Sequence, residues 1–201
     1  MRPSSDIAFT PTVKAVQTAR GSRESFAPLE ARGGWRTRVT PEVAGFIGRA
    51  RTAYLGTANA DGQPYVQHRG GPAGFIRVID EQTLGFADFA GNRQYVTTGN
   101  LLDNPKAFLF IMDYEARRRL KLWGKARAVD GPPELLSALA VEGYAGRVEQ
   151  GILFTVEAWD TNCAQHIPQL FAAEDVAETL AEMQARIDEL EARLAALTGG
   201  T

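Results

Sequence analysis

Seven short segments with the composition of β-strands lie between residues 52 and 158, and most of them are joined by tight turns. The predicted strands are residues 52–58, 64–68, 75–79, 84–88, 107–113, 119–129 and 152–158. The first two flank Asn59-Ala60-Asp61-Gly62, in which glycine supplies the positive φ that a hairpin loop needs. Short strands arranged in hairpins, with few helices between them, predict an antiparallel barrel or closed sheet.

Helices are predicted on both sides of these strands and between them. Thr40-Pro41-Glu42 combines an N-cap, a proline at the first helical position and an acidic residue in the first turn. The predicted helices cover residues 41–50, the second part of 91–103, and 133–144. Residues 1–39 show no sustained hydrophobic period, so we expect an arm there with at most a short helix near residues 13–19.

The C-terminal segment carries a different pattern. Apolar side chains recur there at alternating spacings of four and three, at Val176, Leu180, Met183, Ile187, Leu190, Leu194 and Leu197. Two apolar positions per heptad are typical of a coiled coil, which predicts a helix over 174–198 that pairs with a second subunit, parallel or antiparallel. A helix lying on its own barrel is the alternative, although it would carry a wider apolar face. The predicted organisation is an arm (1–39), a barrel domain (40–172) and a coiled-coil helix (173–201).

Composition and charge limit which kinds of protein this chain can be. The 201 residues are 44% hydrophobic and 23% charged, as in a globular protein with one core. A net charge of -2 gives no support to sequence-independent binding of nucleic acid. The sequence has one cysteine, Cys163, and no stretch apolar enough to span a membrane. We therefore expect a cytoplasmic protein with neither nucleic acid nor membrane as a partner. With only two histidines, His68 and His166, no metal site is expected.

Two loops carry residues suited to an anion. The strand ending at Asp88 is followed by a turn of small residues and by Asn92-Arg93-Gln94, just before a predicted helix. Free N–H groups at a helix start, together with one guanidinium, suit a phosphate, although a plain turn with a surface arginine is the alternative. Gln67-His68-Arg69-Gly70 places a second arginine at a strand end, beside glycines that allow a ligand close to the backbone. If the loops meet, two arginines face one phosphate.

In this order and spacing, the segments resemble the FMN-binding split barrels related to pyridoxamine 5′-phosphate oxidase. The resemblance covers roughly residues 40–170 and is carried by residues 54–58, 61–64, 85–93, 104–105 and 120–126. It implies a split β-barrel with flanking helices, a homodimer, and FMN held in two symmetric sites at the subunit interface.

The resemblance also implies roles for individual residues. Asn92, Arg93 and Gln94 match a Ser-Arg-Lys group that holds the phosphate, with Gln94 in place of the lysine, and Arg69 is the candidate for the missing charge. The other candidates for contact with the cofactor are His68, Gly70, Ala87, Asp88, Phe89, Arg119, Lys121 and Trp159. Ala87, Asp88 and Phe89 are expected beside the ring edge and the ribityl chain, and His166 is the candidate proton donor.

The expected function is that of an FMN-dependent oxidoreductase acting on a small organic substrate. Residues 159–168 depart from the arginine-rich ending that recognises pyridoxal phosphate in vitamin B6 oxidases, so that activity is not expected here. Two alternatives stay open. The scarcity of acid and base residues favours a protein that binds FMN or haem without turnover. The second alternative is a reductase that uses the deazaflavin coenzyme. The anionic tail of that coenzyme would require more basic residues around the site.

Overall fold

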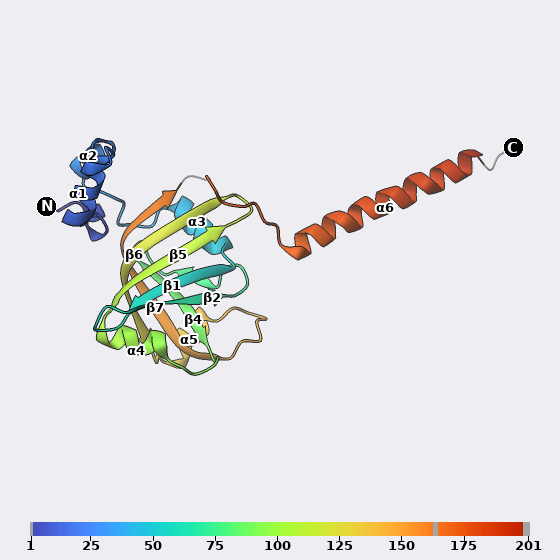
Figure 1. Ribbon diagram of the computed structural model, residues 1–201. Helices are drawn as coiled ribbons and strands as arrows, with labels where there is room; N and C mark the ends of the chain where they lie inside the picture. Colours follow the sequence, from blue (N-terminus) through green and yellow to red (C-terminus); the bar gives the residue numbers. More distant parts are fainter. Residues whose placement is uncertain (1, 163–164, 199–201) are drawn as a thin grey trace. The chain divides into compact units, whose positions relative to one another are not determined.

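The computed structural model describes residues 2–162 and 165–198. Seven antiparallel strands form one curved sheet (Figure 1) in the order β2-β1-β5-β6-β7-β4-β3. The strands are β1 (Thr52–Ala58), β2 (Pro64–Gly70), β3 (Ile76–Val78), β4 (Thr83–Phe89), β5 (Lys106–Asp113), β6 (Arg118–Val129) and β7 (Val148–Asn162). This mainly β split barrel with flanking helices confirms the predicted fold class.

Six α-helices and a short 3-10 helix complete the described part of the chain. They are η1 (Ser4–Ile7), α1 (Pro11–Ala19), α2 (Arg23–Ala31), α3 (Pro41–Arg49), α4 (Val96–Asp103), α5 (Pro133–Leu139) and α6 (Ala173–Thr198). Thr40 caps α3 as predicted, since its side chain accepts a hydrogen bond from the Val43 N–H. Within residues 2–162 and 165–198, no helix is long and apolar enough to cross a membrane.

The barrel core follows from the two-residue period of the strands. Alternate side chains of β1, β5 and β6 point inward and are fully buried, among them Leu55, Leu109, Ile111 and Leu122. Burial of each such side chain contributes about 1.5–3 kcal/mol of hydrophobic stabilisation. The same alternation leaves the intervening side chains of these strands on the outer face of the sheet.

Two elements differ from their predicted lengths. Helix α5 ends at Leu139, five residues before the predicted end, because Ala140 adopts an extended backbone (ψ 154°). Strand β7 covers Val148–Asn162 instead of 152–158. Its additional residues pair with neighbours on both sides, Gln150 with Asp88 of β4 and Asn162 with Arg119 of β6. These polar ends carry no strand signal of their own, and long-range pairing holds them extended.

The N-terminal arm contains more helix than its sequence predicted. The expected helix near residues 13–19 is present as α1, but α2 was not predicted, and Pro28 lies inside it. Tertiary contacts compensate for this weak helical signal: Glu30 of α2 pairs with Arg23 of the same helix and with Lys14 of α1, the latter at 3.1 Å.

Aromatic rings join the arm to the sheet. The ring centroid of Phe9 lies 5.1 Å from that of Phe26 and 4.9 Å from that of Trp35. Trp35 in turn stacks on Trp123 of β6, with centroids 4.5 Å apart and planes 12° apart. The arm is therefore part of the same compact unit as the barrel.

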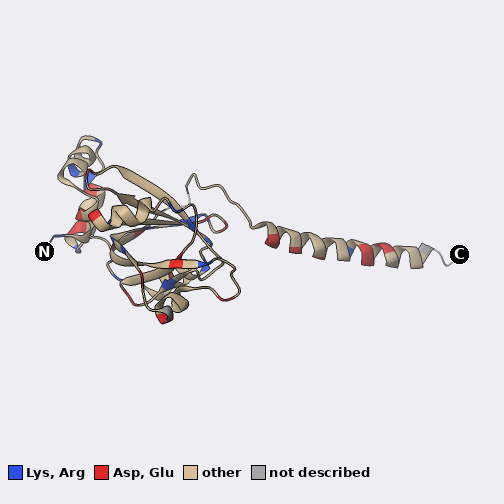
Figure 2. Cartoon of the chain, turned by 90° about the horizontal axis from the view of Figure 1, so that it is seen from below, with Lys and Arg blue, Asp and Glu red and all other residues tan. Residues whose placement is uncertain are grey.

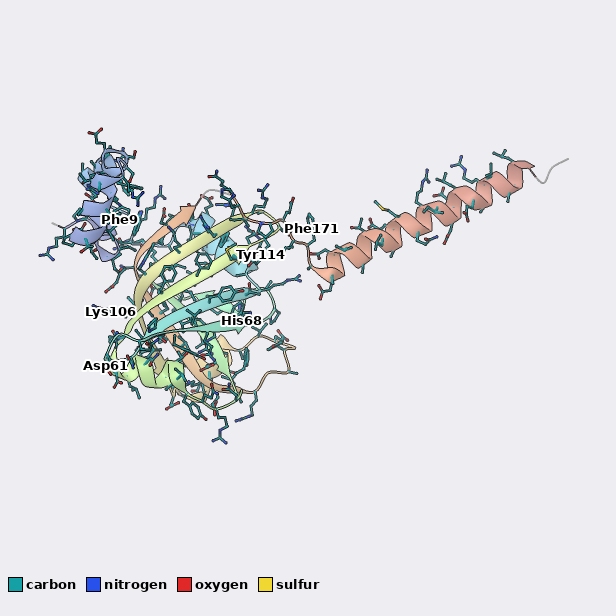
Figure 3. The ribbon with its side chains drawn as sticks, in the orientation of Figure 1. Phe9, Asp61, His68, Lys106, Tyr114 and Phe171 are labelled. Atoms are coloured by element: carbon teal, nitrogen blue, oxygen red, sulfur yellow. The ribbon has the colours of Figure 1, made fainter. Side chains whose placement is uncertain are left out.

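The described residues divide into two compact units, 2–113 with 118–162, and 114–117 with 165–198. In the second unit the Arg117 Nε donates a hydrogen bond to the Ile167 carbonyl at 3.0 Å, and the Gln169 Nε2 donates to that of Glu115 at 3.0 Å. Helix α6 confirms the predicted C-terminal helix, and Figure 3 shows its side chains projecting from it. Its pairing with a second subunit stays a prediction.

Candidate functional site

A cavity of about 230 Å³ lies between strands from opposite ends of the sheet. Its lining comes from β2, β4, the loop before α4, the first turn of α4, and β7: Tyr65, Gln67, Asp88, Phe89, residues 91–98 and Glu149. Because β2 ends the sheet on one side and β4 is the last strand but one on the other, the cavity lies at the split of the barrel. The predicted turn at Asn92-Arg93-Gln94 forms one of its walls.

Helix α4 begins at this cavity without a side-chain cap. Its N-cap residue, Tyr95, has a left-handed backbone (φ 50°) and makes no capping hydrogen bond with its side chain. The first N–H groups of a helix have no partner within the helix, and the helix dipole makes this end electropositive. The preceding turn is shaped by Asn92, whose Oδ1 accepts a hydrogen bond from the Gln94 N–H at 3.2 Å. Such a helix start suits an anion.

Arg93 adds a full positive charge to the same wall. Its side chain is exposed, its φ is 58°, and its Nε donates a hydrogen bond to the Tyr95 hydroxyl at 3.1 Å. That hydroxyl donates onward to the Glu149 carboxylate at 2.8 Å. The hydrogen bond with Tyr95, together with the charge of Glu149, raises the pKa of Arg93 above its ordinary value. The guanidinium therefore stays cationic, and no residue in the described part of the chain accepts a hydrogen bond from its two Nη atoms.

Arg69 is placed differently. It is 8% exposed, and its guanidinium forms an ion pair with the Asp88 carboxylate. The other oxygen of Asp88 accepts a hydrogen bond from the Gln150 Nε2 at 2.8 Å, and the same nitrogen donates to the Thr98 Oγ1 at 2.8 Å. Since Arg69 belongs to β2 and Asp88 to β4, this polar network closes the split of the barrel. The positive charge of Arg69 is balanced by Asp88, and a contact of both arginines with one phosphate stays a prediction.

A second set of polar contacts holds α4 in place. The Thr97 hydroxyl donates to the Gln67 Oε1 at 2.6 Å, and the Asn100 Nδ2 donates to the Thr57 Oγ1 at 3.1 Å. Both acceptors lie on the β1–β2 hairpin, so the helix start that lines the cavity is fixed to the strands beside it. Sequence reasoning missed Gln67, although it shares a strand face with Arg69 two residues later.

Several residues of the cavity gave no signal in the sequence. Glu149 lies more than fifty residues from Tyr95, which it contacts, and only the pairing of β7 with β4 brings it there. The same pairing brings its neighbour Gln150 to Asp88, although Gln150 does not belong to the described lining. Tyr65, Tyr95, Thr97 and Thr98 also went unrecognised as cavity residues. The two threonines could have been recognised from the sequence by their position at the start of a predicted helix.

The predicted strand-end residues of β4 divide between two environments. Asp88 and Phe89 line the cavity, and the ring of Phe89 meets that of Tyr144 edge-on with centroids 5.0 Å apart. Ala87 is buried and does not belong to the lining, because it faces the opposite side of β4 from Asp88. The register shift between Asp88 and Phe89 interrupts this alternation, so both of those adjacent residues line the cavity.

Other predicted cofactor residues lie on the sheet outside the cavity. His68, labelled in Figure 3, is exposed and packs edge-on against Tyr54 across the β1–β2 pair, with centroids 5.6 Å apart. Gly70 closes β2, where an added Cβ would lie 2.8 Å from the His68 ring. On β6, Lys121 pairs with Asp160 at 2.8 Å, and Arg119 lies two residues earlier. None of these four residues belongs to the described lining of the cavity.

Trp159 and His166 belong to different compact units of the chain. Trp159 is a core residue, 8% exposed, and its Nε1 donates to the Arg38 carbonyl at 2.8 Å. It packs against residues 36 and 38 of the arm and does not belong to the described lining of the cavity, so its contact with a ligand stays a prediction. His166 belongs to the second compact unit, where it is exposed with φ 63°. Cys163 lies outside the described residues.

Comparisons with known proteins agree with this fold. Residues 39–163 match the profile of the family described as pyridoxamine 5′-phosphate oxidase, whereas no curated protein matches the chain significantly. HupZ of Group A Streptococcus is 21% identical with a TM-score of 0.51, over 66% of this chain and 99% of that chain, which shows a shared fold.

Two further solved structures are more distant. An FMN-binding protein from Syntrophomonas wolfei is 10% identical with a TM-score of 0.45, over 73% of this chain and 97% of that chain. The heme storage protein HutZ from Vibrio cholerae is 16% identical with a TM-score of 0.41, over 62% of this chain and 94% of that chain. Because the family profile covers well over half of its residues, the chain belongs to the pyridoxamine 5′-phosphate oxidase family.

Proposed function

We propose that this protein binds FMN and is an FMN-dependent oxidoreductase acting on a small organic substrate. The observation that carries the proposal is the uncapped start of α4 with the Arg93 guanidinium beside it, both lining one cavity. Helix amides suit a phosphate dianion, and so does a guanidinium whose two Nη atoms have no acceptor among the described residues. Membership of this family supports flavin as the group attached to that phosphate.

The residues of the cavity fit the phosphate end of FMN. Arg93 would meet the phosphate with two parallel hydrogen bonds, and the first amides of α4 would donate to its remaining oxygens. Tyr65 and Gln94 line the same cavity and are polar groups suited to ribityl hydroxyls. Once bound, the flavin supplies the hydride and electron transfer, while the protein supplies anchoring, orientation and exclusion of water.

The size of the cavity supports a site completed by a second subunit. About 230 Å³ is less than the roughly 300–1,000 Å³ of typical ligand pockets, so the flavin ring would extend beyond it. Tyr65 also lines a groove of about 650 Å³ on the outer face of the sheet, together with Val66, Phe108 and Trp123. Val66 is exposed and the three aromatic side chains are partly exposed, and an aromatic and aliphatic surface of this kind suits a protein interface. We therefore propose a homodimer with two symmetric FMN sites at its interface.

One observation favours binding without turnover as a second candidate. The carboxylates of the cavity are already engaged, Asp88 with Arg69 and Glu149 with Tyr95, and neither histidine belongs to its described lining. Anaerobic reduction of the bound flavin by NAD(P)H distinguishes the two candidates, because a carrier bleaches slowly or not at all. The visible spectrum separates flavin from haem and deazaflavin.

Arg93→Ala is expected to weaken FMN binding roughly 10- to 150-fold, because a hydrogen-bonded contact between charged groups contributes about 1.5–3 kcal/mol. Riboflavin has the same ring and ribityl chain without the phosphate, so its affinity should hardly change. Fluorescence titration of the apoprotein with both flavins, on wild type and variant, measures the two effects. Equal losses for FMN and riboflavin would indicate a collapsed site, and no loss for either would exclude Arg93 as the anchor.

Tyr95→Phe tests how Arg93 is oriented. Removal of the hydroxyl frees Arg93 to pair directly with Glu149, which competes with the phosphate for the same guanidinium. We expect FMN affinity to fall by roughly 2- to 12-fold, which corresponds to one hydrogen bond of about 0.5–1.5 kcal/mol. The same titration on Tyr95→Phe/Glu149→Gln should recover most of the loss. An unchanged affinity in the single variant would show that Tyr95 does not orient the anchor.

A further inference from the structure

We infer that α6 pairs with α6 of a second copy of this chain as a parallel, in-register, two-stranded coiled coil. The inference concerns this helix alone and does not depend on the flavin chemistry proposed above. It rests on three observations: an apolar seam, the placement of the two basic residues of the helix, and the placement of its carboxylates.

The seam is continuous and exposed. Its side chains, from Val176 to Leu197, are each between 44% and 82% exposed. In heptad notation Leu180, Ile187 and Leu194 occupy the a positions, and the intervening apolar residues occupy the d positions. At the centre, the β-branched Ile187 at a followed by Leu190 at d is a combination that favours two strands. An apolar stripe only two residues wide per heptad fits the seam of a partner helix.

The charges beside the seam indicate what the partner is and how it lies. Helix α6 has only two basic residues, Arg186 and Arg193, and both occupy g positions next to the seam. In a parallel pair, the residue at g faces the e position five residues later on the other helix. Arg186 of one copy then faces Glu191 of the second copy, and this contact occurs twice because the pair is symmetric.

The antiparallel arrangement lacks this complementarity. There g faces g and e faces e, so arginine would meet arginine across the seam. Six of the seven carboxylates of α6 occupy outward positions, and Figure 2 shows the acidic positions recurring along the helix. The outward carboxylates can stabilise the single helix, as Glu189 does through its Oε2, which lies 2.5 Å from the Arg186 Nη1. Glu191 is the one carboxylate of α6 beside the seam. The pattern therefore selects a second copy in parallel.

A cysteine at Leu197, in a Cys163→Ser background of the full chain, reports the orientation directly. In a parallel pair the two d positions lie opposite each other, close enough for a disulfide. In an antiparallel pair the two cysteines lie about 30 Å apart at opposite ends of the seam, since a helix rises 1.5 Å per residue. We expect Leu197→Cys to form a disulfide-linked dimer in a glutathione redox buffer. Under the same conditions Val176→Cys mixed with Leu197→Cys should give few mixed dimers.

Charge substitutions in the same cysteine background test the contact between Arg186 and Glu191. Arg186→Glu and Glu191→Arg are each expected to lower the equilibrium yield of the disulfide roughly 5- to 30-fold, because two attractive contacts become repulsive. The double variant Arg186→Glu/Glu191→Arg should restore it. Residues 186 and 191 are five apart and do not face each other on one helix, so only contacts between two copies can account for restoration.

Asp188→Arg is the matched control, because it makes the same change of charge as Glu191→Arg at an outward position and should leave the yield nearly unchanged. Three results would overturn the inference. A predominance of mixed Val176–Leu197 dimers would establish the antiparallel pair. If the double variant does not recover the disulfide yield, the proposed contact between Arg186 and Glu191 of the second copy does not form. No disulfide from Leu197→Cys, with helicity intact, would show that the seam is not covered by a second copy.

Discussion

Replacing Arg69 by methionine is expected to lower the free energy of unfolding by about 3–5 kcal/mol, because it leaves the Asp88 carboxylate without its cation. Arg69 and Asp88 are both largely buried, and their ion pair joins β2 to β4 across the split of the barrel. Gln150 would remain as a partner of Asp88, but a neutral amide does not balance a buried charge. Urea denaturation followed by tryptophan fluorescence measures the loss.

The control removes both charges together. Arg69→Met/Asp88→Leu replaces the pair with apolar groups of similar size, and most of the lost stability should return. If the two single losses simply add in the double variant, the pair does not act as a unit. The same proteins also test the assignment of the phosphate anchor. If Arg69→Met reduced FMN affinity as strongly as Arg93→Ala while stability stayed unchanged, Arg69 and not Arg93 would be the residue meeting the phosphate.

The double variant Ile187→Glu/Leu190→Glu is expected to abolish pairing of α6, with a loss of association of more than about 100-fold. In a pair of helices it places four carboxylates at adjacent layers of an apolar seam, which costs several kcal/mol in desolvation and repulsion. The readout is the disulfide yield of Leu197→Cys, since the proposed barrel interface can keep the subunits together after the helices separate. Helicity from circular dichroism should fall in parallel.

Ala185→Glu/Ala192→Glu is the matched control, because it adds the same number of carboxylates to the same helix at outward positions. Disulfide yield and helicity should both stay near the wild-type values in this control. If the seam variant behaves like the control, the stripe of apolar residues is not an interface at all.

Local sequence patterns predict much of the fold. The two-residue period and the turn at Asn59–Gly62 predict the hairpins, and Gly62 has the left-handed backbone that this loop requires (φ 85°). Thr40-Pro41-Glu42 predicts the start of α3, and the alternating spacing of four and three predicts α6. These signals are reliable because each depends on residues within a few positions of one another. The turn at Asn92–Gln94 belongs to the same class and lines the cavity, and its contact with a phosphate stays a prediction.

The tertiary structure alone decided which charges face the cavity. Arg69 and Arg93 look alike in the sequence, since each follows a predicted strand and lies near small residues. Closure of the sheet brings Asp88 against Arg69 and leaves Arg93 exposed beside the start of α4. The environment of Trp159 likewise depends on a distant segment, because its Nε1 donates to a carbonyl of the arm more than a hundred residues earlier. Neighbours in the chain determine local conformation, whereas the partner of a charged or aromatic side chain depends on strand pairings between distant segments, which no local pattern encodes.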